Sequence, residues 1–119
     1  MPPGARNTAR RVLGVMMIAV SRGAPVGVDL EAIRENVDIA KLLDRIGETQ
    51  LTGTLRELFQ VWARREARTK AVGGPLMEIP TEDLRVADLF APEGFAAALA
   101  MVECDPEVRY WGGSGCGGV

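Results

Sequence analysis

Apolar residues in the first third of the chain fall into two runs separated by turn residues. The run 12–20, VLGVMMIAV, is followed by the glycine- and proline-containing segment 21–25 and then by a second run, 26–30, VGVDL. Two apolar strands joined by a short segment of turn residues form a hairpin. The pattern therefore predicts a β-hairpin whose first strand is buried.

The basic character of the N-terminus allows a second interpretation of the first run. Residues 1–22 contain four arginines and no acid. A basic segment followed by a short apolar one is typical of a secretory signal peptide. The run is, however, much shorter than the ~20 residues that cross a bilayer, and it lacks a small-residue cleavage site. We therefore prefer the buried strand, preceded by a leader of uncertain structure over residues 1–11, and expect no membrane partner.

Two later segments combine helical periodicity with helix-end signals. Asp38 is a suitable N-cap and Gly47 a suitable stop, which predicts a short helix between them. Thr54 followed three residues later by Glu57 forms a capping box. This box predicts a long helix over residues 55–72, ending at a pair of glycines.

The last third of the chain has weaker patterns. Residues 76–92 contain Pro80 and scattered polar residues, so any strand there is expected to be short. Segment 94–103, GFAAALAMVE, is alanine-rich, which favours a helix, but it is short and flanked by turn residues, which favours a strand. Without a repeat or a linker, residues 12–111 are expected to form one domain, and the glycine-rich residues 112–119 a disordered tail.

Composition then removes several classes of function. The chain has 119 residues, a formal net charge of -2 and 47% hydrophobic residues, as in an ordinary single globular domain without a nucleic-acid partner. It has no histidine, and Cys104 and Cys116 lack metal-ligand spacing. A zinc site, a Ser-His-Asp triad and a Cys-His dyad are therefore excluded within this chain. Two isolated cysteines suit a reducing, cytoplasmic location.

The second predicted strand ends in two acids, Asp29 and Glu31. Residues i and i+2 of a strand share one face, so both carboxylates point the same way. They repel each other unless a cation lies between them, and Mg²⁺ is a cation that prefers oxygen ligands. The alternative is that the strand ends here and its last acids are solvated. We expect both acids to lie outside the core.

The long helix places charges where its apolar stripe should continue. The stripe runs through Leu55, Leu58, Phe59 and Trp62, and its next two positions are Glu66 and Lys70. A surface Glu–Lys pair is the alternative, worth a few tenths of a kcal/mol. If Glu66 instead faces the hairpin, three carboxylates with a lysine one turn away describe a site for a metal-bound phosphate.

These residues resemble a known family. Gly27 to Glu31 match the G-x-D-x-E signature of the 4'-phosphopantetheinyl transferase superfamily, and Trp62 to Gly73 match its W-x-x-[KR]-E-[AS]-x-x-K-x-x-G signature, in the same order. Over about residues 12–111 the chain is similar to the C-terminal half of the larger, surfactin-synthetase-activating type. The resemblance implies an α+β half-domain with a small antiparallel sheet packed against one long and one shorter helix. It also implies that segments 94–101 and 107–111 are strands.

The resemblance further implies a reaction. The family transfers the phosphopantetheine arm of coenzyme A to a serine of an acyl or peptidyl carrier protein and releases adenosine 3',5'-bisphosphate, with Mg²⁺ on the pyrophosphate. Asp29 and Glu31 would be metal ligands. Glu66 would be the third ligand or the base for the serine hydroxyl, and Lys70 would contact a phosphate of coenzyme A.

The chain also departs from that family. Larger members carry N-x-S-H-[ST]-G, whose histidine helps to bind coenzyme A, where residues 7–14 here are NTARRVLG. They also have an N-terminal half of similar fold. The small holo-acyl-carrier-protein synthases, which form trimers, have the G-x-D-x-E segment close to the N-terminus.

These departures allow a second interpretation of the chain, as a truncated, inactive remnant that at most binds a partner. We expect a chain that is a poor enzyme alone and that associates with itself.

Overall fold

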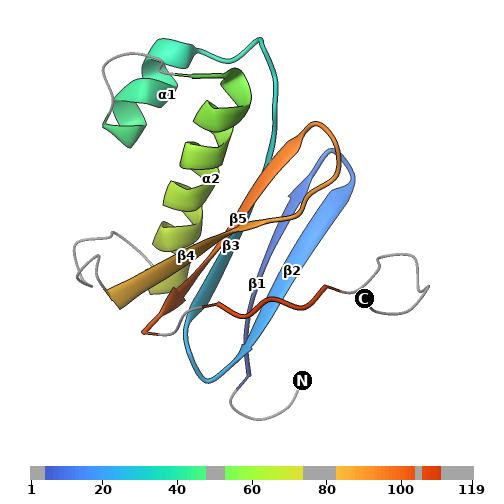
Figure 1. The fold of residues 1–119 in the computed structure, drawn as a ribbon, viewed down its shortest axis with the longest axis vertical. Helices are drawn as coiled ribbons and strands as arrows, with labels where there is room; N and C mark the ends of the chain where they lie inside the picture. The colour runs from blue at the N-terminus through green and yellow to red at the C-terminus, as the bar shows by residue number, and fades with distance from the viewer. Residues whose placement is uncertain (1–4, 48–52, 74–82, 104–105, 111–119) are drawn as a thin grey trace.

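The computed structural model describes residues 5–47, 53–73, 83–103 and 106–110. Within them the chain forms a small α+β fold with two antiparallel sheets and two helices (Figure 1). The elements in chain order are β1 (Ala5–Val12), β2 (Val15–Arg22), β3 (Val26–Ala32), α1 (Ile39–Ile46), α2 (Leu55–Val72), β4 (Leu84–Leu89) and β5 (Phe95–Val102).

The N-terminal hairpin differs from the predicted one. It is formed by β1 and β2, which pair from Ala5–Arg22 to Val12–Val15, and its turn at Leu13 and Gly14 interrupts the predicted strand 12–20. β3, which was predicted to complete the hairpin, pairs instead with β5. The prediction was wrong because the chain turns at Leu13, whose φ of 49° is uncommon for residues other than glycine. An apolar leucine does not mark such a turn in the sequence.

The second sheet has the strand order β3-β5-β4, and both pairings are antiparallel. β5 lies in the centre, so segment 94–101 is mostly a strand rather than the helix that its alanines favour. Small side chains allow a long helix to lie close to a buried sheet, so packing in the sheet outweighs the helix propensity of the alanines. Leu84–Leu89 is the short strand expected within residues 76–92.

α2 covers one face of this sheet, and its closest approach is made by alanines. Ala63, Ala67 and Ala71 are buried in line along the helix and pack against alanines of β5. A Cβ on Gly27 of β3 would collide with the carbonyl oxygen of Ala67 and lie 2.5 Å from the backbone nitrogen of Ala71. Gly27 therefore allows the helix backbone to lie directly on β3.

The hairpin packs on the opposite face of the sheet, as Figure 1 shows with α2 on one side and β2 on the other. Ala19 of β2 joins Val28 and other apolar residues of the sheet in a buried cluster. The alternate residues of β2, Met16, Ile18 and Val20, are each more than half exposed. The prediction of a buried first strand is thus wrong for one face of β2.

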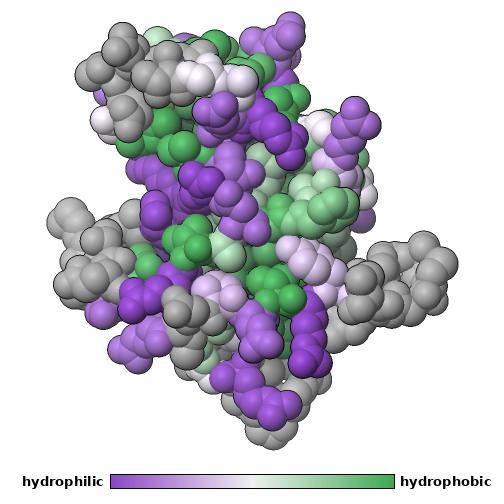
Figure 2. Space-filling view, viewed as in Figure 1, coloured by the Kyte–Doolittle hydropathy of each residue, from purple (hydrophilic) through white to green (hydrophobic). Residues whose placement is uncertain are grey.

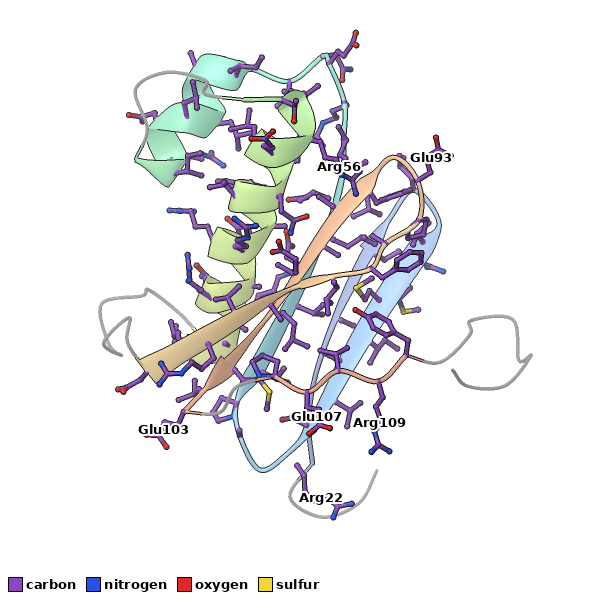
Figure 3. The ribbon with its side chains drawn as sticks, in the orientation of Figure 1. Arg22, Arg56, Glu93, Glu103, Glu107 and Arg109 are labelled. Atoms are coloured by element: carbon purple, nitrogen blue, oxygen red, sulfur yellow. The ribbon has the colours of Figure 1, made fainter. Side chains whose placement is uncertain are left out.

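Apolar side chains are exposed among polar ones on the surface of the molecule. Figure 2 shows apolar residues among the polar ones over the strands in the middle of the view. In Figure 3 the labelled charged residues lie around the rim: Arg56 and Glu93 at one end, Arg22 and Glu103 at the other. Arg11 of β1, which is exposed and pairs with Met16, lies on the same face as the exposed apolar residues of β2.

Both helices begin and end where the sequence predicts. The Asp38 side chain accepts a hydrogen bond from the backbone N–H of Lys41, and Gly47 ends α1 in the left-handed conformation. Thr54 caps α2 by accepting from the N–H of Glu57. These predictions are confirmed because a capping signal acts within one helical turn.

The remaining sequence predictions concern the chain ends. Residues 5–11 of the expected leader lie in β1, whereas the glycine-rich residues 112–119 and Trp111 lie outside the described residues. Residues 106–110 are not a strand; there, the Tyr110 hydroxyl accepts a hydrogen bond from the N–H of Phe90 at 3.0 Å. In the described part of the chain, no helix is long and apolar enough to cross a membrane.

Candidate functional site

Asp29 and Glu31 lie on the face of β3 that α2 covers. Their strand partners are Ala98 and Ala96, which pack beneath the helix. Asp29 is 2% exposed and Glu31 is 7% exposed. The prediction that the two carboxylates share a face is confirmed, but the alternative of a solvated strand end is wrong, as is the expectation that both acids lie outside the core.

Lys70 of α2 forms an ion pair with Asp29. Its Nζ donates to Asp29 Oδ1 at 2.9 Å and to the carbonyl oxygen of Val28 at 3.0 Å. The lysine side chain is 29% exposed, whereas the carboxylate is buried. Lys70 therefore connects a buried acid to the molecular surface, and these contacts use two of the three N–H groups of its ammonium.

Glu31 is held by the indole of Trp62, two helical turns before Lys70. Trp62 Nε1 donates to Glu31 Oε1 at 2.6 Å. Trp62 also packs against a buried cluster that includes Phe59, and the Arg65 guanidinium lies 5.4 Å from the centre of its ring. The two acids of β3 are thus each bound by a residue of α2.

Glu66 lies between these two residues on α2, one turn from each. Its side chain is 27% exposed and pairs with the neighbouring Arg65 at 3.2 Å. The alternative of a surface pair between Glu66 and Lys70 is not what the structure shows, because Lys70 bonds to Asp29. Glu66 therefore lies at the border between interior and solvent, at helical spacing from both Trp62 and Lys70.

The helix is rotated slightly from the orientation that the apolar stripe predicts. The buried line continues from Phe59 through Ala63 and Ala67, rather than through Trp62 and Glu66. The sequence reasoning missed this line because alanine contributes little to a hydrophobic stripe. Trp62 and Lys70 flank the buried line on the side of β3, where they bind the two acids.

The opposite flank of α2 is tied to β4. Arg64 donates two hydrogen bonds to Asp88, at 2.7 and 2.6 Å, and Gln60 donates to Asp88 and to the carbonyl oxygen of Ala97. The hydrogen bonds from Arg64 lower the pKa of the Asp88 carboxyl, and the same contact raises the pKa of Arg64. This exposed pair helps to fix the rotation of the helix over the sheet.

A shallow cavity opens beside Trp62, between α1 and α2. It has a volume of about 200 Å³, and its lining includes Arg34, Lys41 and Arg45 together with Phe59. The Arg34 guanidinium lies 5.2 Å from the centre of the Phe59 ring. Sequence reasoning missed this cationic surface because its residues come from two helices and the loop before them.

The donor set of Asp29 and Glu31 suits Mg²⁺, which binds proteins through one or two carboxylates and completes its shell with water and substrate phosphates. Strand residues two apart rise about 7 Å, so their side chains can converge on one ion. Among the residues that the structure describes, no three acids or cysteines are grouped as a metal cluster, so Glu66 does not join the strand acids in a preformed cage. The carboxylates of Asp29 and Glu31 therefore fit a Mg²⁺ ion whose other ligands are water and the phosphate oxygens of a substrate.

Comparison of the chain with protein-family models, with curated proteins and with solved structures found no match. The function must therefore be argued from the contacts between β3 and α2. Those contacts join two segments more than thirty residues apart, Gly27–Glu31 and Trp62–Lys70.

Proposed function

We propose that this chain is a 4'-phosphopantetheinyl transferase-like half-domain that supports Mg²⁺-dependent transfer of 4'-phosphopantetheine from coenzyme A to a serine of an acyl or peptidyl carrier protein. The observation that carries the proposal is the pairing of the two signature segments across β3 and α2. Asp29 meets Lys70, and Glu31 meets Trp62. If the two motifs occurred together only by chance, their residues would have no reason to contact each other.

In this proposal Asp29 and Glu31 hold Mg²⁺, which would neutralise charge on the pyrophosphate of coenzyme A. Lys70 keeps its bond to Asp29 and donates its remaining N–H to a phosphoryl oxygen. Glu66, at the solvent border, either adds a ligand or accepts the proton of the serine hydroxyl. The serine oxygen then bonds to the phosphorus of the phosphopantetheine arm, the P–O bond of the pyrophosphate breaks, and adenosine 3',5'-bisphosphate leaves.

A second candidate is a catalytically inactive remnant of such an enzyme that acts at most as a binding partner. The exposed outer face of β2, with Met16, Ile18 and Val20, favours it. Large apolar patches on a protein surface usually mark contacts with another protein. A second copy of the chain, or another protein, would cover this face.

Transfer from labelled coenzyme A to an apo carrier protein tests both candidates, with the oligomeric state of the chain fixed by light scattering. We expect labelling of the carrier that requires Mg²⁺, is abolished by chelation, and is much slower than the ~10 s⁻¹ of a typical enzyme. No labelling at any Mg²⁺ concentration would favour the inactive remnant. Rapid turnover by a monomer would show that activity does not require a second protein on the exposed apolar face of β2.

A further inference from the structure

Trp62 and Glu31 make a short hydrogen bond in the candidate site. The indole N–H of Trp62 donates to Glu31 Oε1 at 2.6 Å, and the carboxylate that accepts it is 7% exposed. Hydrogen bonds to an ionised acceptor are shorter and stronger than those between neutral groups. An indole has one donor and no acceptor, so in this contact Trp62 can only orient the carboxylate.

The indole is itself held in place. Its ring packs on the cluster of Leu58, Phe59 and Ala96, and the Arg65 guanidinium lies 5.4 Å from the ring centre. Ala96 is also the strand partner of Glu31, and its small side chain leaves space for the ring between strand and helix. The donor therefore has a fixed position relative to β3.

We propose that Trp62 is a positioning residue, whose indole N–H fixes one oxygen of Glu31 so that the carboxylate is aimed for a divalent cation. The proposal rests on the Mg²⁺ site of the proposed function and adds to it the residue that orients one ligand. Groups that hydrogen-bond a metal ligand fix its orientation, and their loss typically lowers metal affinity by about 10–100-fold. Lys70 makes the corresponding contact to Asp29 at 2.9 Å, so α2 would orient both acids.

The variant Trp62→Phe isolates the N–H, because it keeps an aromatic ring in the cluster and removes the donor. We expect its affinity for Mg²⁺, measured by titration calorimetry on the folded full chain, to fall at least about tenfold. The exposed Val61 on the same helix offers a matched control, and Val61→Ala should leave the affinity unchanged. In a double-mutant cycle with Glu31→Gln, the two losses should be far from additive because both remove the same contact.

A spectroscopic measurement on the unaltered site keeps the test valid if Trp62→Phe does not fold. The chain has two tryptophans, so an NMR spectrum of the ¹⁵N-labelled protein has two indole N–H signals, which Trp111→Phe assigns. The Trp62 signal should shift as Mg²⁺ saturates, and Glu31→Gln should remove that shift.

The outcomes separate this inference from the proposed function. Equal Mg²⁺ affinity in parent and Trp62→Phe, or a Trp62 signal that does not move while calorimetry shows saturation, would overturn the positioning role and leave the Mg²⁺ site standing. A parent chain that binds no Mg²⁺ would overturn the site and the positioning role together. A tenfold or greater loss in Trp62→Phe with unchanged melting temperature supports both.

Discussion

Replacing Gly27 with alanine is expected to destabilise the fold by about 3 kcal/mol or more, because the added methyl group overpacks a contact that cannot relax cheaply. The Cβ would collide with the backbone of Ala67 and come within 2.5 Å of the backbone nitrogen of Ala71. Backbone atoms in the middle of α2 cannot rotate away as a side chain does. Such a loss is a large share of the 5–15 kcal/mol that stabilises a typical domain. Urea unfolding followed by circular dichroism measures it.

The matched control is Gly14→Ala in the turn of the hairpin. Gly14 has a φ of 81°, and a Cβ there would meet no atom within 4 Å. This variant reports the cost of an unfavourable backbone conformation alone, about 1–2 kcal/mol. A loss in Gly27→Ala no larger than in Gly14→Ala would contradict the close approach of α2 to β3, and with it the placement of both acids.

Replacing Glu66 with glutamine is expected to lower the rate of phosphopantetheine transfer by about 100-fold or more, the usual contribution of a general base. The amide has the size of the carboxylate but cannot accept the serine proton, and it is a poor Mg²⁺ ligand. The fold should be nearly unaffected, because the side chain lies at the surface border and its described partner is the adjacent Arg65. Single-turnover transfer from labelled coenzyme A, with melting temperature alongside, measures both effects.

Glu57→Gln is the control for Glu66→Gln, because it makes the same chemical change on the same helix. Glu57 lies in the first turn of α2, where it forms the capping box with Thr54, and glutamine also serves in that position. Its transfer rate should equal that of the parent. If Glu66→Gln is as active as the parent as well, Glu66 has no part in the mechanism and is simply the partner of Arg65.

The helices show what the sequence alone could predict. Asp38, Gly47, Thr54 and Glu57 act on backbone groups within one turn, so their effect does not depend on the rest of the fold. The shared face of Asp29 and Glu31 follows from strand geometry in the same way. Predictions of this kind needed no knowledge of which strands pair.

The sheet shows where such prediction ends. The turn at Leu13 and Gly14 has positive φ at both positions, which suits a two-residue hairpin, but leucine is not a residue that marks it. The pairing of β3 with β5 joins residues about seventy positions apart, and nothing in the local pattern of either strand specifies the other. The strand state of the alanine-rich β5 is likewise set by its place in the centre of the sheet rather than by propensity.

The contacts within the candidate site could not be predicted from the sequence. Asp29, Glu31 and Lys70 lie in the β3–α2 contact, but that Lys70 binds Asp29 and that Trp62 binds Glu31 depend on the rotation and closeness of the helix. Both are set by Gly27 and by the line of buried alanines on α2, which hydrophobic periodicity does not reveal. Burial of the two acids, too, became visible only once the helix was placed over them.

Mg²⁺ binding at Asp29 is the measurement that tests the central claim most directly. Titration calorimetry would compare the parent with Asp29→Asn, with and without coenzyme A, because Mg²⁺ completes its shell with phosphate oxygens. The asparagine variant keeps an acceptor for Lys70, and its folding would be checked by melting temperature, since Asp29 is buried. We predict that the parent binds Mg²⁺ more tightly when coenzyme A is present. Under the same conditions, folded Asp29→Asn should bind Mg²⁺ at least about tenfold more weakly than the parent. No binding by the parent, or equal affinity in the two proteins, would contradict the account.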